Sequence, residues 1–205
     1  MRINAQPFGS PDLLWRPYDA DRLAGIGAPV GAVAALTGRG LPDCDQFGRV
    51  PERELEVAEL PGCGRAAFLG QVWDGFNNSY WLGLADGRVW MRYGTWDEPD
   101  PGTKPINASV EALQSVLAVY AQFENEESDD QDDEEHEGLI IQTVIHPVAA
   151  DPEAFEDGEN WWPIVFQEVG FYSRRIMLGE RDLFELVDRD TLGQWGVDHP
   201  GYEQE

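Results

Sequence analysis

The stretch W-L-G-L-A-D-G-R-V-W-M-R-Y, from Trp81 to Tyr93, decides the fold. Two apolar, aromatic-rich runs flank Asp86-Gly87, a dipeptide suited to the positive backbone angles of a two-residue hairpin turn. The stretch therefore predicts a β-hairpin. A turn at these two residues sets three pairs opposite one another on one face, which is predicted to be core: Leu84 and Val89, Leu82 and Met91, and Tyr80 and Tyr93.

The other face of the hairpin carries two tryptophans. The predicted register sets Trp81 against Arg92, whose guanidinium can stack on the indole. It sets Gly83 against Trp90, and the missing side chain of the glycine leaves room for that second indole. Aromatic groups are therefore expected on both faces.

The segments before and after the hairpin predict one more strand and two loops. Ala67–Trp73 alternates like a strand that is buried on both faces, and its short link to the hairpin predicts a three-stranded antiparallel meander. Residues 43–64 and 96–104 are rich in polar residues and proline, so most of both is predicted to be loop.

Two helices are expected beside the meander. One begins at Pro29 and ends at Gly38-Arg39-Gly40, with Gly40 left-handed just past its end. The other is capped by Ser109 and runs through Phe123. Its apolar positions form a single stripe that predicts packing on the sheet: Val110, Leu113, Val116, Leu117, Tyr120 and Phe123.

The final third begins with ten carboxylates and no lysine or arginine between Glu124 and Glu137. Self-repulsion predicts a disordered acidic insertion or helix tail, and a solvating linker is favoured over a docking motif. Leu139–Ile145 is predicted as a strand, although such a run also fits a buried helix segment. A helical turn is expected over Asp151–Phe155, and Asn160 is expected to cap a helix with one apolar face: Trp162, Val165, Phe166 and Val169.

Composition narrows the possible functions. The 205 residues are 42% hydrophobic, enough for a real core, and 39 Asp and Glu against 14 Lys and Arg give a formal net charge of −25. Such a field repels nucleic acid and membrane surfaces and attracts basic partners, so direct nucleic-acid binding and membrane binding are not expected. No apolar run near the start resembles a signal peptide, which favours a cytoplasmic location.

No catalytic, cofactor or metal site is predicted. The sequence contains no G-x-S-x-G, phosphate-loop, H-E-x-x-H or dinucleotide-binding motif, and its three histidines are scattered. Carboxylates are so numerous that a pair drawn from them carries no information about catalysis. Cys44 and Cys63 are expected to be reduced structural thiols, although a disulfide between them stays open.

Five phrases occur in a characteristic order. They are G-L-P at Gly40–Pro42, F-L-G at Phe68–Gly70, the hairpin itself, I-N-A-S-V-E-A-L at Ile106–Leu113, and D-P-E-A-F at Asp151–Phe155 followed by Trp161-Trp162-Pro163. Together they resemble the SUKH superfamily, and within it the fourth immunity-protein family, over about residues 15–169.

The resemblance implies an α+β fold with a central antiparallel sheet and flanking helices. It also implies an immunity protein without catalytic residues or cofactor, which binds and neutralises a bacterial toxin. The acidic insertion at 124–137, the β-branched run at 139–145 and everything from about Ser173 depart from the family pattern. The expected organisation is a SUKH-like domain over 15–170, interrupted at 124–137, and an extension of unknown role over 171–205.

The favoured hypothesis is therefore an immunity protein that occludes the active site of a basic nuclease, or of another toxin acting on nucleic acids, with an acidic surface. The alternatives are a regulatory or scaffold module of the same fold, and an acidic hydrolase, which would need a pocket with a perturbed carboxylate. Trp73, Trp90 and Trp162 fit core positions. Tryptophans surrounded by acidic residues are suited to contact a basic partner, although packing in the core is the more frequent role of a tryptophan. The candidate partner contacts are Trp81, Trp96, Asp97, Glu98, Asp100 and Trp161.

Overall fold

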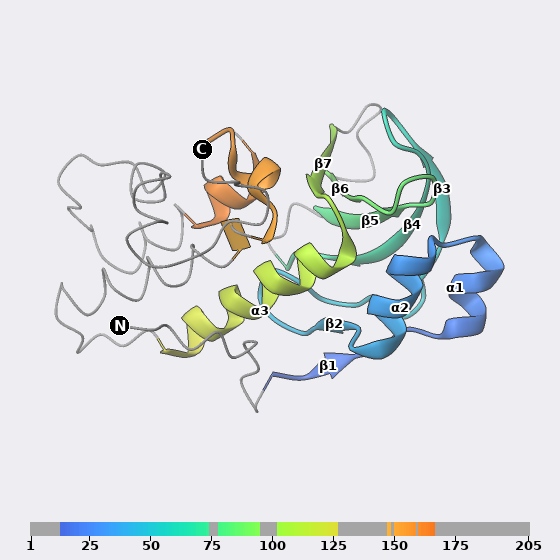
Figure 1. Cartoon of the computed structure of the whole chain (residues 1–205), viewed down its shortest axis with the longest axis horizontal. Coiled ribbons are helices and arrows are strands. Elements are labelled where there is room, and N and C mark those ends of the chain that lie inside the picture. Colours follow the sequence, from blue (N-terminus) through green and yellow to red (C-terminus); the bar gives the residue numbers. More distant parts are fainter. Residues whose placement is uncertain are drawn as a thin grey trace, which may run out of the picture.

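The computed structural model describes residues 13–73, 78–94, 102–126, 147–148, 150–158 and 160–166. Their main feature is a five-stranded antiparallel sheet in the order β3-β4-β5-β6-β7, and a two-stranded sheet, β1-β2, lies beside it (Figure 1). The strands are β1 (Trp15–Arg16), β2 (Leu41–Pro42), β3 (Val57–Leu60), β4 (Gly64–Gln71), β5 (Ser79–Gly83), β6 (Val89–Arg92) and β7 (Thr103–Asn107). The predicted α+β class and the meander β4-β5-β6 are confirmed.

The hairpin β5-β6 has the predicted faces but a register shifted by two residues. Trp81 pairs with Trp90 instead of Arg92, and Leu82 pairs with Val89 instead of Met91. Within the turn only Gly87 has a positive φ, of 79°. A two-residue turn of the predicted type needs two such residues, so the chain forms a longer loop, closed by hydrogen bonds between Gly83 and Arg88 and between Gly87 and Gly83. A shift by two residues keeps every side chain on its face.

Neither edge strand was predicted: β3 lies in the predicted loop 43–64, and β7 runs from the end of the predicted loop 96–104 towards the Ser109 cap. Strand β3 is covered only at Leu60, and its other three side chains are at least partly exposed. Strand β7 contains Lys104 and Pro105, residues that protect sheet edges from further pairing. Both strands therefore lack the alternating apolar pattern by which a half-buried strand is recognised in a sequence.

Helices α1 (Ala20–Ile26), α2 (Val30–Gly38) and α3 (Val110–Glu126) accompany the sheet. Helix α1 was not predicted, although Asp19 accepts a hydrogen bond from Arg22 N at its start and Gly27 is left-handed at its end. The predicted left-handed Gly40 is confirmed with a φ of 78°. The Ser109 cap of α3 is also confirmed, because its hydroxyl accepts from Ala112 N at 3.2 Å.

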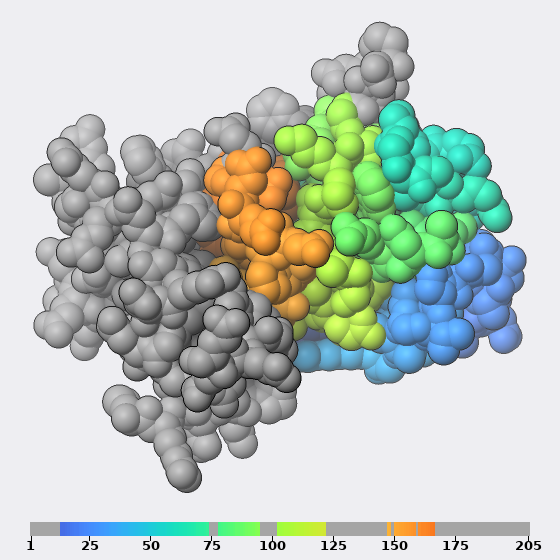
Figure 2. Space-filling model, turned by 45° about the horizontal axis from the view of Figure 1, so that its top comes forward, coloured from blue at the N-terminus to red at the C-terminus, as the bar shows by residue number. Residues whose placement is uncertain are grey.

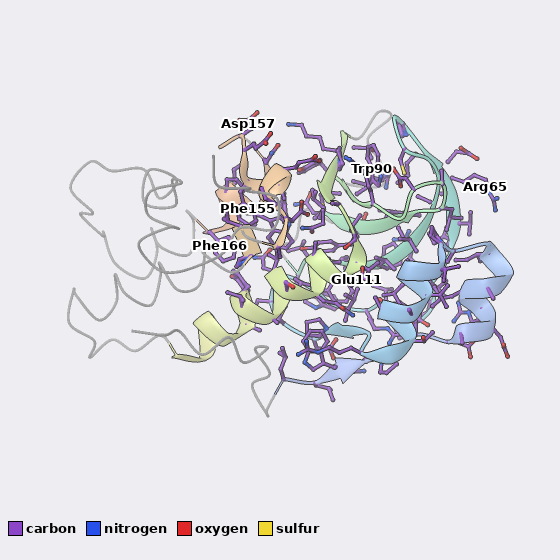
Figure 3. The ribbon with its side chains drawn as sticks, in the orientation of Figure 1. Arg65, Trp90, Glu111, Phe155, Asp157 and Phe166 are labelled. Atoms are coloured by element: carbon purple, nitrogen blue, oxygen red, sulfur yellow. The ribbon has the colours of Figure 1, made fainter. Side chains whose placement is uncertain are left out.

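The main core lies between the sheet and the helices. It contains the five described apolar residues of the α3 stripe and the predicted inward face of the hairpin, where Tyr80, Leu82, Val89 and Met91 are fully buried. A second, smaller cluster lies on the other face of the sheet and contains Leu60, Ala66, Phe68 and Trp81, with Trp90 packed against it (Figure 3). The sheet is therefore buried on both faces near its centre.

A carboxyl-terminal group of residues completes the main core. The predicted turn forms as the 3-10 helix η1 (Pro152–Phe155), and residues 161–166 are helical. Phe155 and Phe166 have their ring centroids 6.1 Å apart (Figure 3). Figure 2 shows these residues, in orange, against the strands and α3. The predictions for 139–145 and 171–205, and most of the acidic segment 124–137, lie outside the described residues.

Candidate functional site

Trp81, a predicted partner contact, belongs to the core. Its side chain is fully buried, and its indole Nε1 donates a hydrogen bond to Ser79 Oγ at 2.9 Å. Phe68 lies edge-on to it with a centroid distance of 5.4 Å. The predicted arginine stack exists with a different partner, because Arg53 rather than Arg92 lies over Phe68 and Trp81, at 4.1 and 5.9 Å. Trp81 therefore presents no surface to another protein.

Trp161 is half-buried at the margin of the main core. Its ring packs edge-on to Tyr93 at 5.8 Å and to Trp162 at 6.4 Å. Burial raises the pKa of the Tyr93 hydroxyl to about 12. The other four predicted contacts, Trp96, Asp97, Glu98 and Asp100, lie outside the described residues.

Trp73, which was expected in the core, is mostly exposed, unlike the other large aromatic side chains among the described residues. Its side chain is 62% exposed, because β4 ends at Gln71 and Trp73 lies beyond the sheet. The indole rests on Gly48, where a Cβ atom would overlap the indole Nε1. A glycine at this position is what allows the ring to lie against the backbone.

A surface hollow of about 690 Å³ opens beside Trp73. Two backbone bridges hold its wall, one between Cys44 and Phe47 and one between Gly48 and Gln71 at the end of β4. Its lining is mostly charged or polar: Arg16, Asp43, Cys44, Asp45, Gly48, Arg49, Pro51, Glu54 and Trp73. The hollow was not predicted, because its walls come from three segments far apart in the chain.

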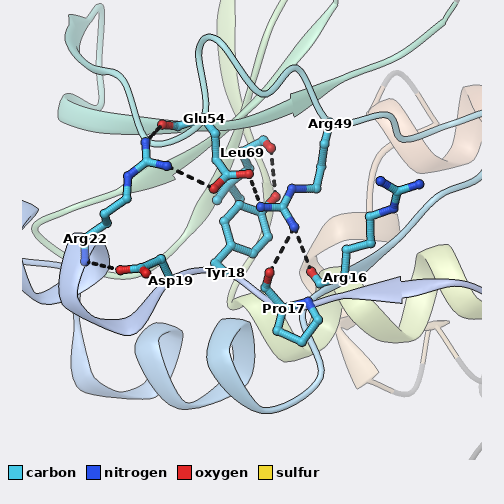
Figure 4. Close-up of polar contacts among 8 residues, drawn as sticks. All are labelled: Arg16, Pro17, Tyr18, Asp19, Arg22, Arg49, Glu54 and Leu69. Atoms are coloured by element: carbon cyan, nitrogen blue, oxygen red, sulfur yellow. Dashed lines mark hydrogen bonds and ion pairs between the residues drawn. The ribbon is translucent and has the colours of Figure 1, made fainter.

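Arg49, which lines the hollow, is held in place by several contacts (Figure 4). Its guanidinium donates to the carbonyl oxygens of Arg16 and Pro17 at 3.1 and 3.0 Å and forms an ion pair with Glu54. It also lies 4.0 Å above the ring of Tyr18. The Tyr18 hydroxyl donates to Leu69 O at 2.8 Å, and burial raises its pKa well above the usual value, against the opposing effect of Arg49.

Glu54 also forms an ion pair with a second arginine, Arg22 of α1, whose Nη1 lies 3.2 Å from the carboxylate (Figure 4). The next residue, Leu55, is buried in the main core with a φ of 60°, a conformation that bulky side chains rarely adopt. Such conformations persist where the surroundings enforce them and concentrate at functional sites. Here the backbone turns so that Leu55 enters the core while Glu54 faces the hollow.

The carboxylates of the hollow differ in their pairing. Asp43 forms an ion pair with Arg16 at 2.6 Å, and Glu54 is paired with Arg22 and Arg49. Asp45 is exposed and has no ion-pair partner among the described residues. The lining thus holds three acids and two arginines, an excess of one negative charge next to Trp73.

Asp151, away from the hollow, is a buried acidic residue. Its carboxylate, in a side chain only 3% exposed, accepts hydrogen bonds from Asn107 Nδ2 at 3.0 Å and from Ala108 N at 2.8 Å. Asn107 Oδ1 in turn accepts from Trp162 Nε1 at 2.9 Å. We call these residues, Asp151, Asn107 and Trp162, the clamp, because they tie the carboxyl-terminal group to the junction of β7 and α3.

Comparison with known proteins decides the family. A family model described as SUKH-4 immunity protein matches residues 8–168. The chain belongs to the SUKH-4 immunity protein family. No curated protein and no solved structure matches it. Both the hollow and the clamp lie within the SUKH-4 match, and the clamp gives the phrase D-P-E-A-F a structural role, since its first residue is Asp151.

The described part of the SUKH-4 chain offers few groups for chemistry. None of its His, Cys, Asp and Glu residues gather in threes that could hold a metal ion. No disulfide joins Cys44 and Cys63, both of which lie in the described part of the chain, and burial raises the pKa of Cys63 to about 11. Among the helices described, none is long and apolar enough to cross a membrane.

Charge is unevenly distributed along the SUKH-4 chain. The described side chains include nine Lys and Arg and fourteen Asp and Glu, so they carry only −5 of the net −25. Half of the remaining −20 comes from the ten acids of 124–137. The described body is thus close to charge balance, and its hollow is a local feature in a mixed surface.

Proposed function

We propose that this protein is an immunity protein that binds one cognate bacterial toxin in the cytoplasm and neutralises it by covering the toxin's active site. Membership of the SUKH-4 immunity protein family over residues 8–168 carries the proposal. Protection by binding needs a rigid body with an accessible, chemically distinctive surface and no catalytic group. The sheet supplies the rigid body, and the hollow beside Trp73 supplies such a surface.

The proposed toxin is basic and acts on nucleic acid. Proteins that bind nucleic acid use Lys and Arg to neutralise phosphates, so their active-site grooves are positive. A net charge of −25 attracts such a groove over a distance and raises the association rate. In this proposal the acid-rich segments supply the long-range attraction, while the nearly balanced folded body supplies the specific contacts.

The hollow is the proposed principal contact surface. The sequence candidates that lie outside the described residues, Trp96, Asp97, Glu98 and Asp100, stay proposed as a second contact, together with Trp161. Trp161 packs on Tyr93, only three residues before Trp96 in the chain. Trp81 is withdrawn from the proposed contacts because its side chain is fully buried.

The test is protection by co-expression. The toxin to use is the one encoded beside this gene, induced in a sensitive host with and without this protein. We expect survival only when the protein is present, and a one-to-one complex with a catalytically inactive form of that toxin. The complex should weaken steeply as salt rises from 0.05 to about 0.5 M, because the Debye length shortens to a few ångströms.

A different outcome would favour the alternative function. Absence of protection, combined with co-purification of several cellular proteins, would point to a regulatory or scaffold module of the same fold. A tight complex that is insensitive to salt would keep the immunity function but exclude the basic, electrostatically guided toxin.

A further inference from the structure

The indole of Trp73 is held in place although most of its surface faces solvent. Gly48 lies directly beneath the ring, and Trp73 N donates to Asp45 O at 3.5 Å. Gly48 and Gln71 exchange two backbone hydrogen bonds, of 2.8 and 2.9 Å, which join this wall to the end of β4. An exposed aromatic ring on a rigid support loses little conformational entropy when a partner packs on it.

The remaining charges of the hollow are suited to a cation rather than an anion. Arg49 already donates to two carbonyl oxygens and to Glu54, and Arg16 is paired with Asp43. An incoming anion would have to compete with these acceptors for either guanidinium. Asp45, in contrast, has no ion-pair partner among the described residues and is linked through the backbone to Trp73.

In three other places of this chain, an arginine side chain stacks on an aromatic ring. Arg39 lies 3.5 Å from the ring centroid of Trp15, Arg49 lies 4.0 Å from that of Tyr18, and Arg53 lies 4.1 Å from that of Phe68. For Trp73 no such cation is found in the part of the chain that the structure describes. An arginine or lysine that enters the hollow could therefore make two favourable contacts, a cation–π contact with the indole of Trp73 and an ion pair with the carboxylate of Asp45.

We propose that the hollow binds one arginine or lysine side chain of the toxin, with its cation stacked on the indole of Trp73 and paired with the carboxylate of Asp45. This inference rests on the proposed immunity function and assigns the contact that gives it specificity. Asp45 is the carboxylate of the lining that has no ion-pair partner among the described residues, which matches one incoming cation. The volume of about 690 Å³ also accommodates the residues that flank this side chain in the toxin.

The first experiment needs no toxin. The full chain is labelled with ¹⁵N, and the indole N–H signal of Trp73 is assigned as the one lost in Trp73→Phe. Titration with a hexa-arginine peptide should move this signal saturably, and Asp45→Asn should weaken the apparent affinity roughly 3- to 10-fold, the usual size of one charge-assisted contact. A hexa-glutamate peptide should leave the signal unmoved.

The indole signal is needed because the acidic segments also attract a basic peptide. Binding at the acidic segment 124–137 alone is expected to leave the indole signal of Trp73 in place, so a saturable shift that depends on Asp45 reports binding in the hollow. Val30→Ala is the matched control: Val30 is apolar, 86% exposed and does not line the hollow. The inference is overturned if the Trp73 signal does not move, or if it moves equally in wild type and Asp45→Asn.

The second experiment uses the inactive form of the toxin encoded beside the gene. We expect Trp73→Ala to weaken its binding at least ~30-fold, as for a central aromatic contact, and Val30→Ala to leave it unchanged. Urea unfolding of each variant shows whether the fold is retained. Wild-type protection with full binding by Trp73→Ala overturns this inference alone, whereas failure of the wild type to protect overturns the proposed function.

Discussion

The clamp and the hollow both place an aspartate beside a tryptophan, but they treat the pair in opposite ways. In the clamp, Asp151 is 3% exposed, its carboxylate accepts two hydrogen bonds, and fully buried Trp162 is bound to the same asparagine. In the hollow, Trp73 is 62% exposed and Asp45 has no ion-pair partner among the described residues. The polar groups of the clamp are hydrogen-bonded to one another and hold the fold together. Asp45 and Trp73 in the hollow remain available to a partner.

This difference predicts that the two regions respond to different measurements. A buried acceptor with satisfied donors contributes to stability, because its removal strands those donors away from water. An exposed carboxylate and an exposed indole contribute little to stability, so their removal should be visible only in binding. The variants below test this division from the largest expected effect to the smallest.

The largest effect is expected for Asp151→Ala. The substitution leaves Asn107 Nδ2 and Ala108 N without their acceptor at the junction of β7 and α3. An unsatisfied donor costs about 1–3 kcal/mol when it is buried, as Asn107 Nδ2 is, and less when it is partly exposed, as Ala108 N is, so the free energy of unfolding should fall by about 2–3 kcal/mol. Urea unfolding followed by circular dichroism measures this change.

The matched control for that variant is Glu156→Ala, an exposed acid five residues further along. Its effect should stay within about 0.5 kcal/mol, as for surface substitutions in general. If Asp151→Ala and Glu156→Ala unfold at the same urea concentration, the clamp does not hold the carboxyl-terminal group to the sheet.

The next effect concerns the support beneath Trp73. In Gly48→Ala the new Cβ overlaps the indole, which can swing outward because it is mostly exposed. We expect a loss of stability of only about 1 kcal/mol, but a loss of hexa-arginine binding at the Trp73 signal comparable to that of Asp45→Asn. Unchanged peptide binding in Gly48→Ala would show that the position of the ring does not matter.

Gly31→Ala provides the comparison for the glycine itself. Gly31 lies inside α2, and nothing lies within 4 Å of the Cβ that an alanine would add there. Replacing a helical glycine by alanine should raise the free energy of unfolding by about 0.5–1 kcal/mol and leave peptide binding unchanged. A loss of stability in Gly48→Ala together with a gain in Gly31→Ala would show that the Gly48 effect comes from the clash with the indole, and not from the general effect of replacing glycine by alanine.

The sequence predicted the centre of the sheet because alternation survives errors of register. A shift of two residues in the hairpin moved Trp81 from Arg92 to Trp90 but kept the core face correct. The register depends instead on how many turn residues have a positive φ, and only Gly87 does. The edge strands were missed because β3 and β7 are too polar and too exposed to show a periodic pattern.

The site was less predictable than the fold, and Trp73 shows why. An alternating run does not reveal where its hydrogen bonding stops, so Trp73 was assigned to a strand that ends two residues earlier. Its support, Gly48, is 25 positions away in the chain and pairs with Gln71 through the backbone, which leaves no mark on either side chain. Helix α1 differs, since Asp19 and Gly27 are recognisable boundary residues that could have identified it.

An effect confined to alkaline pH is expected for Tyr93, which packs on Trp161. Burial raises its pKa from 10.0 to about 12, so the neutral hydroxyl is favoured in the folded state. The resulting stability is fully present below pH 10 and is lost as the pH rises towards 12. In Trp161→Ala, which removes the ring packed on Tyr93, we expect the pKa to return towards 10, as measured by ultraviolet absorbance of the phenolate. Trp73→Ala is the control, because it removes an exposed tryptophan that does not pack on Tyr93 and should leave the titration of Tyr93 unchanged.

The smallest effect should come from the ion pair at the rim of the clamp, between Arg88 and Glu153. The two groups are 3.5 Å apart, and their side chains are 44% and 68% exposed, so water screens most of their attraction. Glu153→Gln should change the free energy of unfolding by less than about 0.5 kcal/mol, and added salt should have no larger effect on wild type than on the variant. This near-zero result matters, because Glu153 is two residues from Asp151 and carries the same charge. A loss as large as that of Asp151→Ala would mean that charge near the junction, rather than satisfaction of its buried donors, stabilises the carboxyl-terminal group, and the contrast between clamp and hollow would then lose its physical basis.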